Sequence, residues 1–338
     1  MRRTGIALFA LAALVLGTAA SQHKTWSWDL PPGIAPPPVP GDNPMSKAKV
    51  ELGHRLFYDA DLSIDGTMSC ATCHDQKRGF ADGNRTRPGV HGDPGRRNVQ
   101  GLGNVGYLAP LTWADSRLST LEIQVAVPVF GDDPVEMGMK GKEAEIARRL
   151  SKDKCYRTMF RKAFPETGGS IDPPNVAKAL AAFQRSMLSY NSPYDRAGRG
   201  EHGALSAEAR RGKALFAANC ASCHSGDNFS DGKFHTIPTG SPSSDAGLAH
   251  ATGRAEDKGK FRTPGLRNAS LTAPYFHDGS IASLEEAILR HASVVPAAGT
   301  LTASQRADLL ALLDALTDRS FVSDPKFALP HEACGKPL

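Results

Sequence analysis

Apolar residues recur every three to four positions in several segments, and a residue type that typically caps a helix precedes each segment. These spacings predict helices that begin after Ser46, Asp172, Ser206, Ser283 and Thr302. Alternating apolar and polar positions, the pattern of a half-buried strand, are scarce, and the connecting segments are long and rich in Gly, Pro and Asp. The pattern therefore predicts an all-α fold with long loops.

Two of these helix starts carry a stronger signal. Ser283 is followed three residues later by Glu286, and Thr302 by Gln305, which is the spacing of a capping box. The helix after Ser283 is expected to run through His291, and it would hold that imidazole on a rigid element.

One pattern occurs twice. A Gly-x-x-Leu-Phe segment at 53–57 precedes a Cys-x-x-Cys-His segment at 70–74, and the same pair recurs at 212–216 and 220–224. The repeat predicts two related domains. Glycines cluster between Tyr194 and Leu205, so the domains are expected at 45–200 and 201–338.

The start of the chain differs from the rest. Residues 1–20 combine a basic beginning, an apolar run and small residues at the end, which is the pattern of a cleaved signal peptide. A retained membrane anchor is the weaker interpretation, because a spanning helix needs about 20 apolar residues. Residues 21–44 are Pro-rich and predict an extended leader, and no later segment is apolar enough to span a membrane. We therefore expect export to the periplasm.

The net charge of the chain adds little to the predicted function. The formal net charge is +5 and includes Arg2 and Arg3, which leave with the signal peptide. No basic stretch alternates with aromatic residues in the way that a nucleic-acid groove requires. Nucleic acid is therefore not an expected partner.

The repeated Cys-x-x-Cys-His segment is the attachment signal of c-type haem, in which two thiols bond the haem and the histidine binds its iron. Zinc sites and redox dithiols share part of this pattern, but they need further nearby ligands or a βαβ context. The two copies are Cys70 and Cys73 with His74, and Cys220 and Cys223 with His224. Together they predict two covalently bound haem c groups.

Two cysteines remain once the haem motifs are set aside. Lone thiols in an oxidising compartment often pair, so Cys155 and Cys334 are candidates for a disulfide. The sequence does not show whether they come within bonding distance, so two free thiols stay an alternative.

The sixth ligand of the second haem influences its function, since methionine raises the reduction potential of a haem. All seven methionines lie at or before Met187, so none follows the second haem motif. The downstream candidates are His235, His250, His277, His291 and His331. His291 is favoured because its helix would hold it rigidly, whereas a loop histidine is more often solvated.

For the first haem, the chain between the motifs offers His91, Glu136, Met137 and Met139. A peroxidase needs a group that moves a proton between the peroxide oxygens. Glu136 could do this, although on its own an exposed carboxylate is the more common interpretation. Trp113 is the only tryptophan beyond the leader; it is either a core aromatic or an electron relay.

These residues resemble a known family, the bacterial di-haem cytochrome c peroxidases and their MauG-type relatives. The resemblance runs from about Met45 to Leu316. Its segments include 69–75, 79–83, 134–137, 231–235, 261–264, 266–268 and 272–279, with Arg97, Asn98, Trp113, Gln124 and Pro128 between them. The resemblance implies two cytochrome c-like domains and peroxide as the oxidant.

The resemblance also implies roles for single residues. The first haem, held by His74, is the one that reacts with peroxide, and Glu136 is its acid–base group. Gln124 and Pro128 line the same pocket, and Trp113 lies between the haems. A further set, Asn98, Thr272 and Pro274, matches a calcium site between the domains, with the oxygen ligands that this ion prefers.

Two departures from the family matter. Its peroxidases place a methionine ligand where MauG has a tyrosine, and this chain has His291 at that position. A second haem with two histidine ligands has a lower potential than a His/Met haem and is less suited to accept electrons from a high-potential carrier. His91 lies in a loop where some members have a histidine that closes the resting active site; a solvated histidine is the alternative.

Three hypotheses follow. In the first, the protein resembles MauG-like or MbnH-like enzymes: hydrogen peroxide generates high-valent haem, which oxidises a tryptophan or tyrosine of a partner protein. In the second, it is a cytochrome c peroxidase that reduces peroxide to water with electrons from a small cytochrome or cupredoxin. In the third, it is an electron-transfer cytochrome without enzymatic activity.

Overall fold

The computed structural model describes residues 26–238 and 244–337, so the expected signal peptide at 1–20 lies outside the described residues. The described chain is mostly helical. It also contains two short antiparallel ribbons, β1 (Phe234–His235) with β2 (Phe261–Arg262), and β3 (Glu332–Ala333) with β4 (Lys336–Pro337). Apart from these ribbons, the architecture agrees with the expected all-α class.

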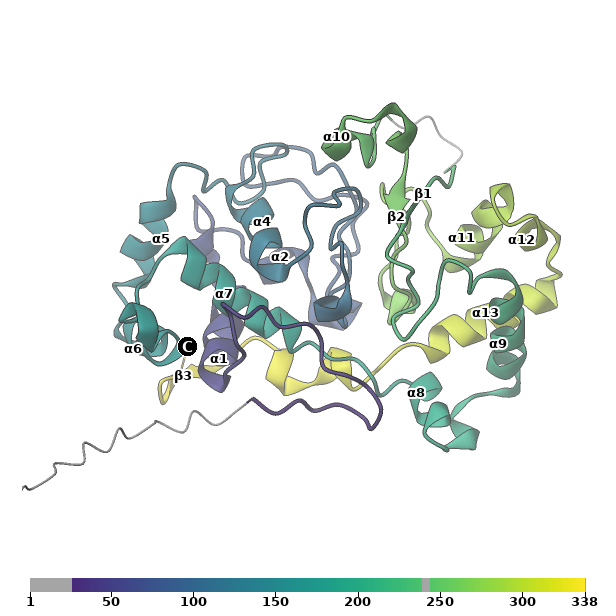
Figure 1. Cartoon of the computed structure of the whole chain (residues 1–338), viewed down its shortest axis with the longest axis horizontal. Helices are drawn as coiled ribbons and strands as arrows, with labels where there is room; N and C mark the ends of the chain where they lie inside the picture. Colours follow the sequence, from purple (N-terminus) through teal and green to yellow (C-terminus); the bar gives the residue numbers. More distant parts are fainter. Residues whose placement is uncertain (1–25, 239–243, 338) are drawn as a thin grey trace, which may run out of the picture.

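The helices fall into two groups, with the β1–β2 ribbon between them (Figure 1). The first group is α1 (Lys47–Phe57), α2 (Cys70–Cys73), α3 (Leu121–Gln124), α4 (Ala126–Phe130), α5 (Glu143–Leu150), α6 (Lys154–Ala163) and α7 (Pro173–Arg185). The second is α8 (Pro193–Gly198), α9 (Ala207–Asn219), α11 (Leu284–Arg290), α12 (Pro296–Thr300) and α13 (Ala303–Ala315), whereas α10 (Ala249–Thr252) lies above the ribbon.

The predicted helix starts are confirmed, because each capping side chain accepts a hydrogen bond from a backbone N–H of the first turn. The capping residues are Ser46, Asp172, Ser206, Ser283 and Thr302. Thr302 and Gln305 form the complete capping box. The helix after Ser283 is shorter than expected: α11 ends at Arg290, and His291 occupies its C-cap.

The repeated glycine has the same structural cause in both halves. Helices α1 and α7 cross at Gly53, where a Cβ atom would overlap the carbonyl oxygen of Ala179. Helices α9 and α13 cross at Gly212, where a Cβ atom would overlap the carbonyl oxygen of Asp308. Each repeat therefore encodes one close helix crossing next to its Cys-x-x-Cys-His segment.

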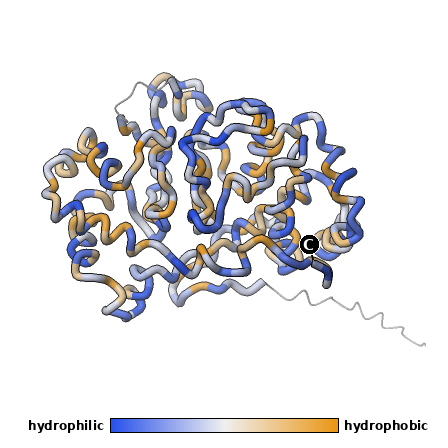
Figure 2. The backbone as a smooth tube through the Cα atoms, turned by 180° about the vertical axis from the view of Figure 1, so that it is seen from behind, coloured by the Kyte–Doolittle hydropathy of each residue, from blue (hydrophilic) through white to orange (hydrophobic). Residues whose placement is uncertain are grey.

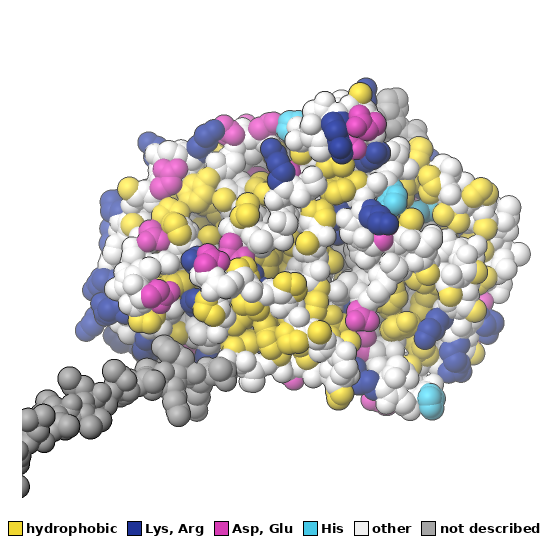
Figure 3. Space-filling model, in the orientation of Figure 1, with side chains coloured by type: hydrophobic (Ala, Val, Ile, Leu, Met, Phe, Trp, Pro, Cys, Tyr) yellow, Lys and Arg dark blue, Asp and Glu magenta, His cyan; other side chains and the backbone are white. Residues whose placement is uncertain are grey.

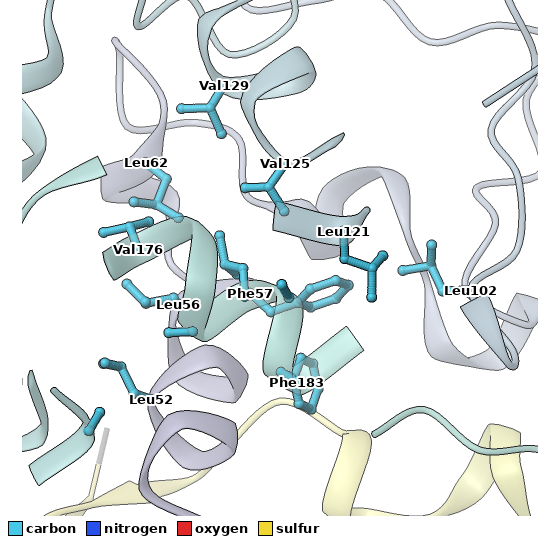
Figure 4. Packing of buried hydrophobic residues seen from close by; sticks show 14 of the residues in the cluster. Leu52, Leu56, Phe57, Leu62, Leu102, Leu121, Val125, Val129, Val176 and Phe183 are labelled. Carbon is cyan, nitrogen blue, oxygen red and sulfur yellow. The ribbon is translucent and has the colours of Figure 1, made fainter. Parts of the chain in front are cut away.

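Each helix group has its own hydrophobic core. In the larger core, Leu52, Leu56 and Phe57 of α1 point toward Val176 and Phe183 of α7 (Figure 4). The smaller core contains Phe216, Phe229, Leu309, Leu312, Leu313 and Leu316. Figure 2 shows the hydrophobic stretches of the helices alternating with hydrophilic positions and loops.

The end of the chain returns to the first core. After α13 it runs back along the lower side of the first helix group (Figure 1), and Phe321 and Phe327 are buried in the larger core. A disulfide then joins Cys334 to Cys155 of α6, with 5.9 Å between the two Cα atoms. The last residues of the expected second domain, 201–338, thus pack against the first, because their aromatic side chains fill its core.

The surface carries both signs of charge. On the face in Figure 3, basic and acidic side chains are interspersed. Within the described residues, no helix has the length and apolar character that crossing a membrane requires.

Candidate functional site

The first Cys-x-x-Cys-His segment is a single helical turn. Cys70 and Cys73 lie three residues apart on α2, so both thiols project from one side of the turn. Thr72 Oγ1 accepts a hydrogen bond from Ser69 N at 2.9 Å, which fixes the start of the turn. Burial raises the pKa of both thiols to about 12, so they remain protonated at neutral pH.

The two motif histidines are oriented in the same way. His74 Nδ1 donates to the carbonyl of Phe80 at 2.6 Å, and His224 Nδ1 donates to the carbonyl of Phe229 at 3.0 Å. Phe80 and Phe229 both adopt left-handed backbone conformations, with φ of 64° and 54°. A hydrogen bond at Nδ1 leaves Nε2 with a lone pair for iron, as second-shell partners of metal-bound histidines do.

His291 faces the second of these histidines. The ring centres of His224 and His291 are 6.3 Å apart, and His291 Nδ1 donates to the carbonyl of Ala287 at 2.7 Å. Metal–imidazole bonds are about 2 Å long, so rings on opposite sides of one metal ion have centres about 6 Å apart. This separation therefore fits an iron between the two imidazoles.

The same three histidines are held neutral. Burial lowers the pKa of His224 to about 4, and it also lowers the pKa values of His74 and His291. A metal binds the neutral form of imidazole, so near pH 7 protons do not compete with iron for these ligands.

Glu136 lies in a segment that backbone hydrogen bonds hold in place. Its carbonyl accepts from Val90 N at 2.8 Å, and the next residue, Met137, donates to the carbonyl of Pro128 at 2.9 Å. Burial raises the pKa of the Glu136 carboxyl. The carboxyl also lies close enough to Cys73 to act on that thiol's pKa. The structure thus brings Glu136 and Pro128 to the side of the first motif.

The other residues expected around this pocket are less tightly connected to it. Gln124 ends α3, and its side chain has no hydrogen bond within the part of the chain that the structure describes. His91 is exposed, and its Nε2 lies beside Gly138, two residues beyond Glu136. Neither position by itself assigns a role to these side chains.

Trp113 is buried where the two helix groups meet. Its indole Nε1 donates to the carbonyl of Asn98 at 2.8 Å, and its own carbonyl accepts from Arg262 N of β2 at 2.7 Å. Trp113 as a whole residue is 9% exposed. Trp113 therefore joins the first helix group to the ribbon beside the second.

The three expected calcium ligands lie in two segments that one hydrogen bond connects. Asn98 N donates to the carbonyl of His277 at 2.8 Å, three residues beyond Pro274. The Asn98 amide nitrogen donates to the carbonyl of Asn84, which leaves its oxygen facing elsewhere. No described hydrogen bond joins Asn98 to Thr272 or Pro274 directly.

Three residues of types that commonly bind metal ions lie together beside the second motif. Cys223, Asp231 and His235 have ligand atoms within 4.8 Å of one another. His235 Nε2 and Asp231 Oδ2 are 2.9 Å apart, and the backbone of Asp231 donates to the carbonyl of Cys223. Because Cys223 belongs to the Cys-x-x-Cys-His segment, this cluster is part of that site rather than a separate one.

Comparison with known proteins places the chain in a family. The profile of di-haem cytochrome c peroxidases matches residues 47–203, and that of cytochrome c matches residues 209–317. The methylamine utilization protein MauG of Methylophilus methylotrophus is 34% identical over 85% of this chain and 86% of its own. The chain belongs to the di-haem cytochrome c peroxidase and MauG family. It is therefore a haem-dependent oxidoreductase, and its family holds two haem c groups.

Relatives within this family carry two kinds of name. The cytochrome c551 peroxidase of Pseudomonas aeruginosa is 34% identical over 72% of each chain. A solved structure described as a MauG-like protein associated with microbial copper homeostasis is 40% identical, with a TM-score of 0.85 over 90% of this chain and 99% of the other. One of these two relatives is therefore named a peroxidase and the other a MauG-like protein.

Sequence reasoning missed one part of the site. The left-handed conformations of Phe80 and Phe229 aim their carbonyls at the two motif histidines. Non-glycine residues rarely adopt this conformation, so no simple turn signal marks them. The available clue was the glycine directly before Phe80, in the segment 79–83.

Proposed function

We propose that this protein is an exported, periplasmic di-haem enzyme that uses hydrogen peroxide to oxidise a side chain, tryptophan or tyrosine, of a partner protein. The observation that carries the proposal is the facing pair of His224 and His291, at 6.3 Å between ring centres. The pair supports a second haem with two histidine ligands, and such a haem has a lower potential than one with a methionine ligand.

The residues of the two motifs fit the haem groups. Cys70, Cys73 and His74 would hold the first haem, and Cys220, Cys223, His224 and His291 the second; all four of these cysteines are free of disulfides. Within the described residues, the Nε2 atoms of the three histidines have no hydrogen-bond partner. When bound, haem would supply a redox-active iron at each of these sites.

Glu136 is the proton carrier in this proposal. Its carboxylate takes the proton from one peroxide oxygen and delivers it to the other, so that the O–O bond breaks with water as the leaving group. Per turnover, one peroxide takes up two electrons and two protons and gives two waters. The two electrons and the two protons come from the partner side chain, which loses two hydrogen atoms overall and is thereby oxidised.

Trp113 is the relay between the halves in this proposal. Its backbone and indole contact both the first helix group and the β1–β2 ribbon. A second haem of low potential is suited to share oxidising equivalents with the first across this residue. It is correspondingly less suited to accept electrons from a high-potential carrier.

The names of the relatives favour a second candidate as well. Several relatives of similar identity are named cytochrome c peroxidases. In that case the two electrons come from a small cytochrome or cupredoxin, and the product is only water. The third hypothesis, an electron-transfer cytochrome without enzymatic activity, has no support from a family of peroxidase-type enzymes.

A calcium ion at the domain junction is part of the proposal. The ligands would be the side-chain oxygen of Asn98 and the carbonyls of Thr272 and Pro274, which are hard oxygen donors of the kind that calcium prefers. The buried position of Asn98, and its amide nitrogen bonded to Asn84, support this assignment.

Two measurements test the proposed function. Electron paramagnetic resonance of the oxidised protein should give one high-spin signal and one low-spin signal typical of two imidazole ligands. Peroxide consumption is then followed with a reduced cytochrome or cupredoxin as the sole donor. Sustained turnover with either donor would favour the second candidate, whereas slow consumption, together with oxidation of a co-expressed partner detected by mass spectrometry, would favour the first.

A further inference from the structure

Arg262 is a buried cation without a carboxylate partner. It lies on β2 and is 2% exposed. The side chains of Arg185 and Arg267 are about as deeply buried, and each forms an ion pair, with Glu122 and Asp195 respectively. Among the described residues, no carboxylate lies within ion-pair distance of Arg262, although a buried charge normally requires a partner.

Among the described residues, the hydrogen-bond partners of its guanidinium are all uncharged. Nε donates to the carbonyl of Thr112 at 3.3 Å, Nη1 donates to the carbonyl of Thr263 at 3.1 Å, and Nη2 donates to the side-chain oxygen of Gln100. A guanidinium has five N–H donors, so within the part of the chain that the structure describes two donors and the positive charge have no partner. Burial lowers the pKa of Arg262 to about 10, which keeps the group cationic at neutral pH.

The position of this cation connects the two motif histidines. On one side, Gln100, whose side chain accepts from Arg262, lies two residues before Leu102. The Leu102 N–H donates to the carbonyl of Gly79, next to Phe80, whose carbonyl accepts from His74. On the other side, Arg262 Nη1 and Ser230 Oγ both donate to the carbonyl of Thr263, and Ser230 follows Phe229, whose carbonyl accepts from His224. The guanidinium therefore lies between the two expected haem sites.

Trp113 lies next to Arg262, between the two expected haem sites. The backbone N–H of Arg262 donates to the Trp113 carbonyl at 2.7 Å, and the Arg262 side chain bonds the carbonyl of the preceding residue, Thr112. The charge is thus fixed at both its backbone and its side chain, at the junction of the helix groups. A surface arginine would lose this precision to side-chain motion and to solvent screening.

We propose that Arg262 is a carboxylate-binding site that pairs with a propionate group of one of the two haems. Each haem c carries two carboxylates, and a guanidinium with free N–H groups binds a carboxylate through two parallel hydrogen bonds. The haem carboxylate then supplies the counter-charge that the protein chain lacks here. The proposal rests on the two-haem centre of the proposed function, but not on which molecule is oxidised.

The pairing has a redox consequence. A fixed positive charge near an iron favours its reduced form, so removal of the charge lowers the reduction potential of that haem. The reduction potential of the haem whose propionate binds Arg262 should change more than that of the other haem. The haem whose reduction potential shifts more is therefore the one that supplies the carboxylate.

The test uses the full-length holoprotein with R262Q, R262K and the control R254Q, which removes the charge of an exposed arginine. Midpoint potentials of both haems are measured by spectroelectrochemistry. We expect R262Q to shift the ferric-to-ferrous ratio of one haem at least about tenfold toward ferric, which is about 59 mV for one electron. R262K should shift it less, and R254Q should leave both potentials unchanged. Unchanged potentials in R262Q that retains two haems would overturn the proposal.

A second measurement uses the wild-type protein, so it does not depend on whether an Arg262 variant folds. Infrared difference spectra between the ferric and ferrous wild-type protein are recorded with natural and with ¹⁵N-labelled arginine. We expect a guanidinium band that shifts on labelling, because an arginine bonded to a haem carboxylate responds to the charge of the iron. A difference spectrum without any label-sensitive band would overturn the proposal, even if the partner-oxidising activity is intact.

Discussion

The indole Nε1 of Trp113 donates a buried hydrogen bond to the backbone carbonyl of Asn98, 2.8 Å away. A carbonyl oxygen is an acceptor of hydrogen bonds and not a base at neutral pH. The indole therefore has no group at Nε1 that would take its proton when it is oxidised. In the proposed role of Trp113 as a relay, electron transfer would therefore need no proton transfer at Nε1.

This arrangement gives the first prediction. In W113F, reaction of the enzyme with peroxide should proceed at the wild-type rate, while oxidation of the partner or donor slows by at least about tenfold, a barrier increase of about 1.4 kcal/mol. Stopped-flow spectroscopy and donor oxidation measure the two steps separately. W28F, in the leader, is the matched control. Equal slowing of both steps would instead indicate a structural defect.

Glu136 gives the second prediction. E136Q should slow peroxide activation by about 10² or more, since general acid–base catalysis contributes about that much. E51Q, a change at an exposed glutamate of α1, should leave the rate unchanged. An unchanged stopped-flow rate in E136Q would remove this residue from the mechanism.

The pH dependence follows from the same carboxyl. Burial raises the pKa of Glu136, and the deprotonated form is the one that accepts the peroxide proton. The activation rate should therefore fall as the pH drops through this pKa, above the pH range in which an ordinary glutamate titrates. In E136Q this dependence should vanish. A wild-type rate that rises toward lower pH would contradict the assignment.

Local features of the fold could be predicted from the sequence. The caps at Ser46 and Thr302 depend on hydrogen bonds to residues three positions away, and the structure contains them. The return of Phe321 and Phe327 to the first core could not be foreseen, because apolar character does not specify which of two cores a segment joins.

The candidate site was predictable to a similar degree. Each Cys-x-x-Cys-His motif is contiguous, so its chemistry is visible without a structure. His291 was one of five downstream histidines, and its choice rested on the expected helix and on the resemblance to the family. Its approach to His224 is a tertiary contact across 67 residues of chain. Arg262 was visible only as part of a motif, since burial without a counter-charge is a property of the folded state.

The disulfide gives the third prediction. The double variant C155S/C334S should lower the free energy of unfolding by about 2–4 kcal/mol, because the bond closes a long loop in the unfolded chain. Thermal or denaturant unfolding of the oxidised holoprotein measures this change. The haem absorption spectrum should stay unchanged, since the bond joins the chain end to α6 and not to either haem motif. Two titratable thiols at these positions in the native protein would contradict the pairing.

The fourth prediction concerns His291. H291M should raise the midpoint potential of the second haem, because a thioether ligand stabilises ferrous iron relative to an imidazole. The ferric-to-ferrous ratio should shift at least about tenfold toward ferrous, which is about 59 mV for one electron. The unbranched methionine side chain adapts to irregular space, so it can reach toward His224 from the end of α11. H250M, at an exposed histidine, is the control. An unchanged potential and an unchanged low-spin signal in H291M would show that another residue binds this iron, and the case for a partner-oxidising enzyme would lose its main support.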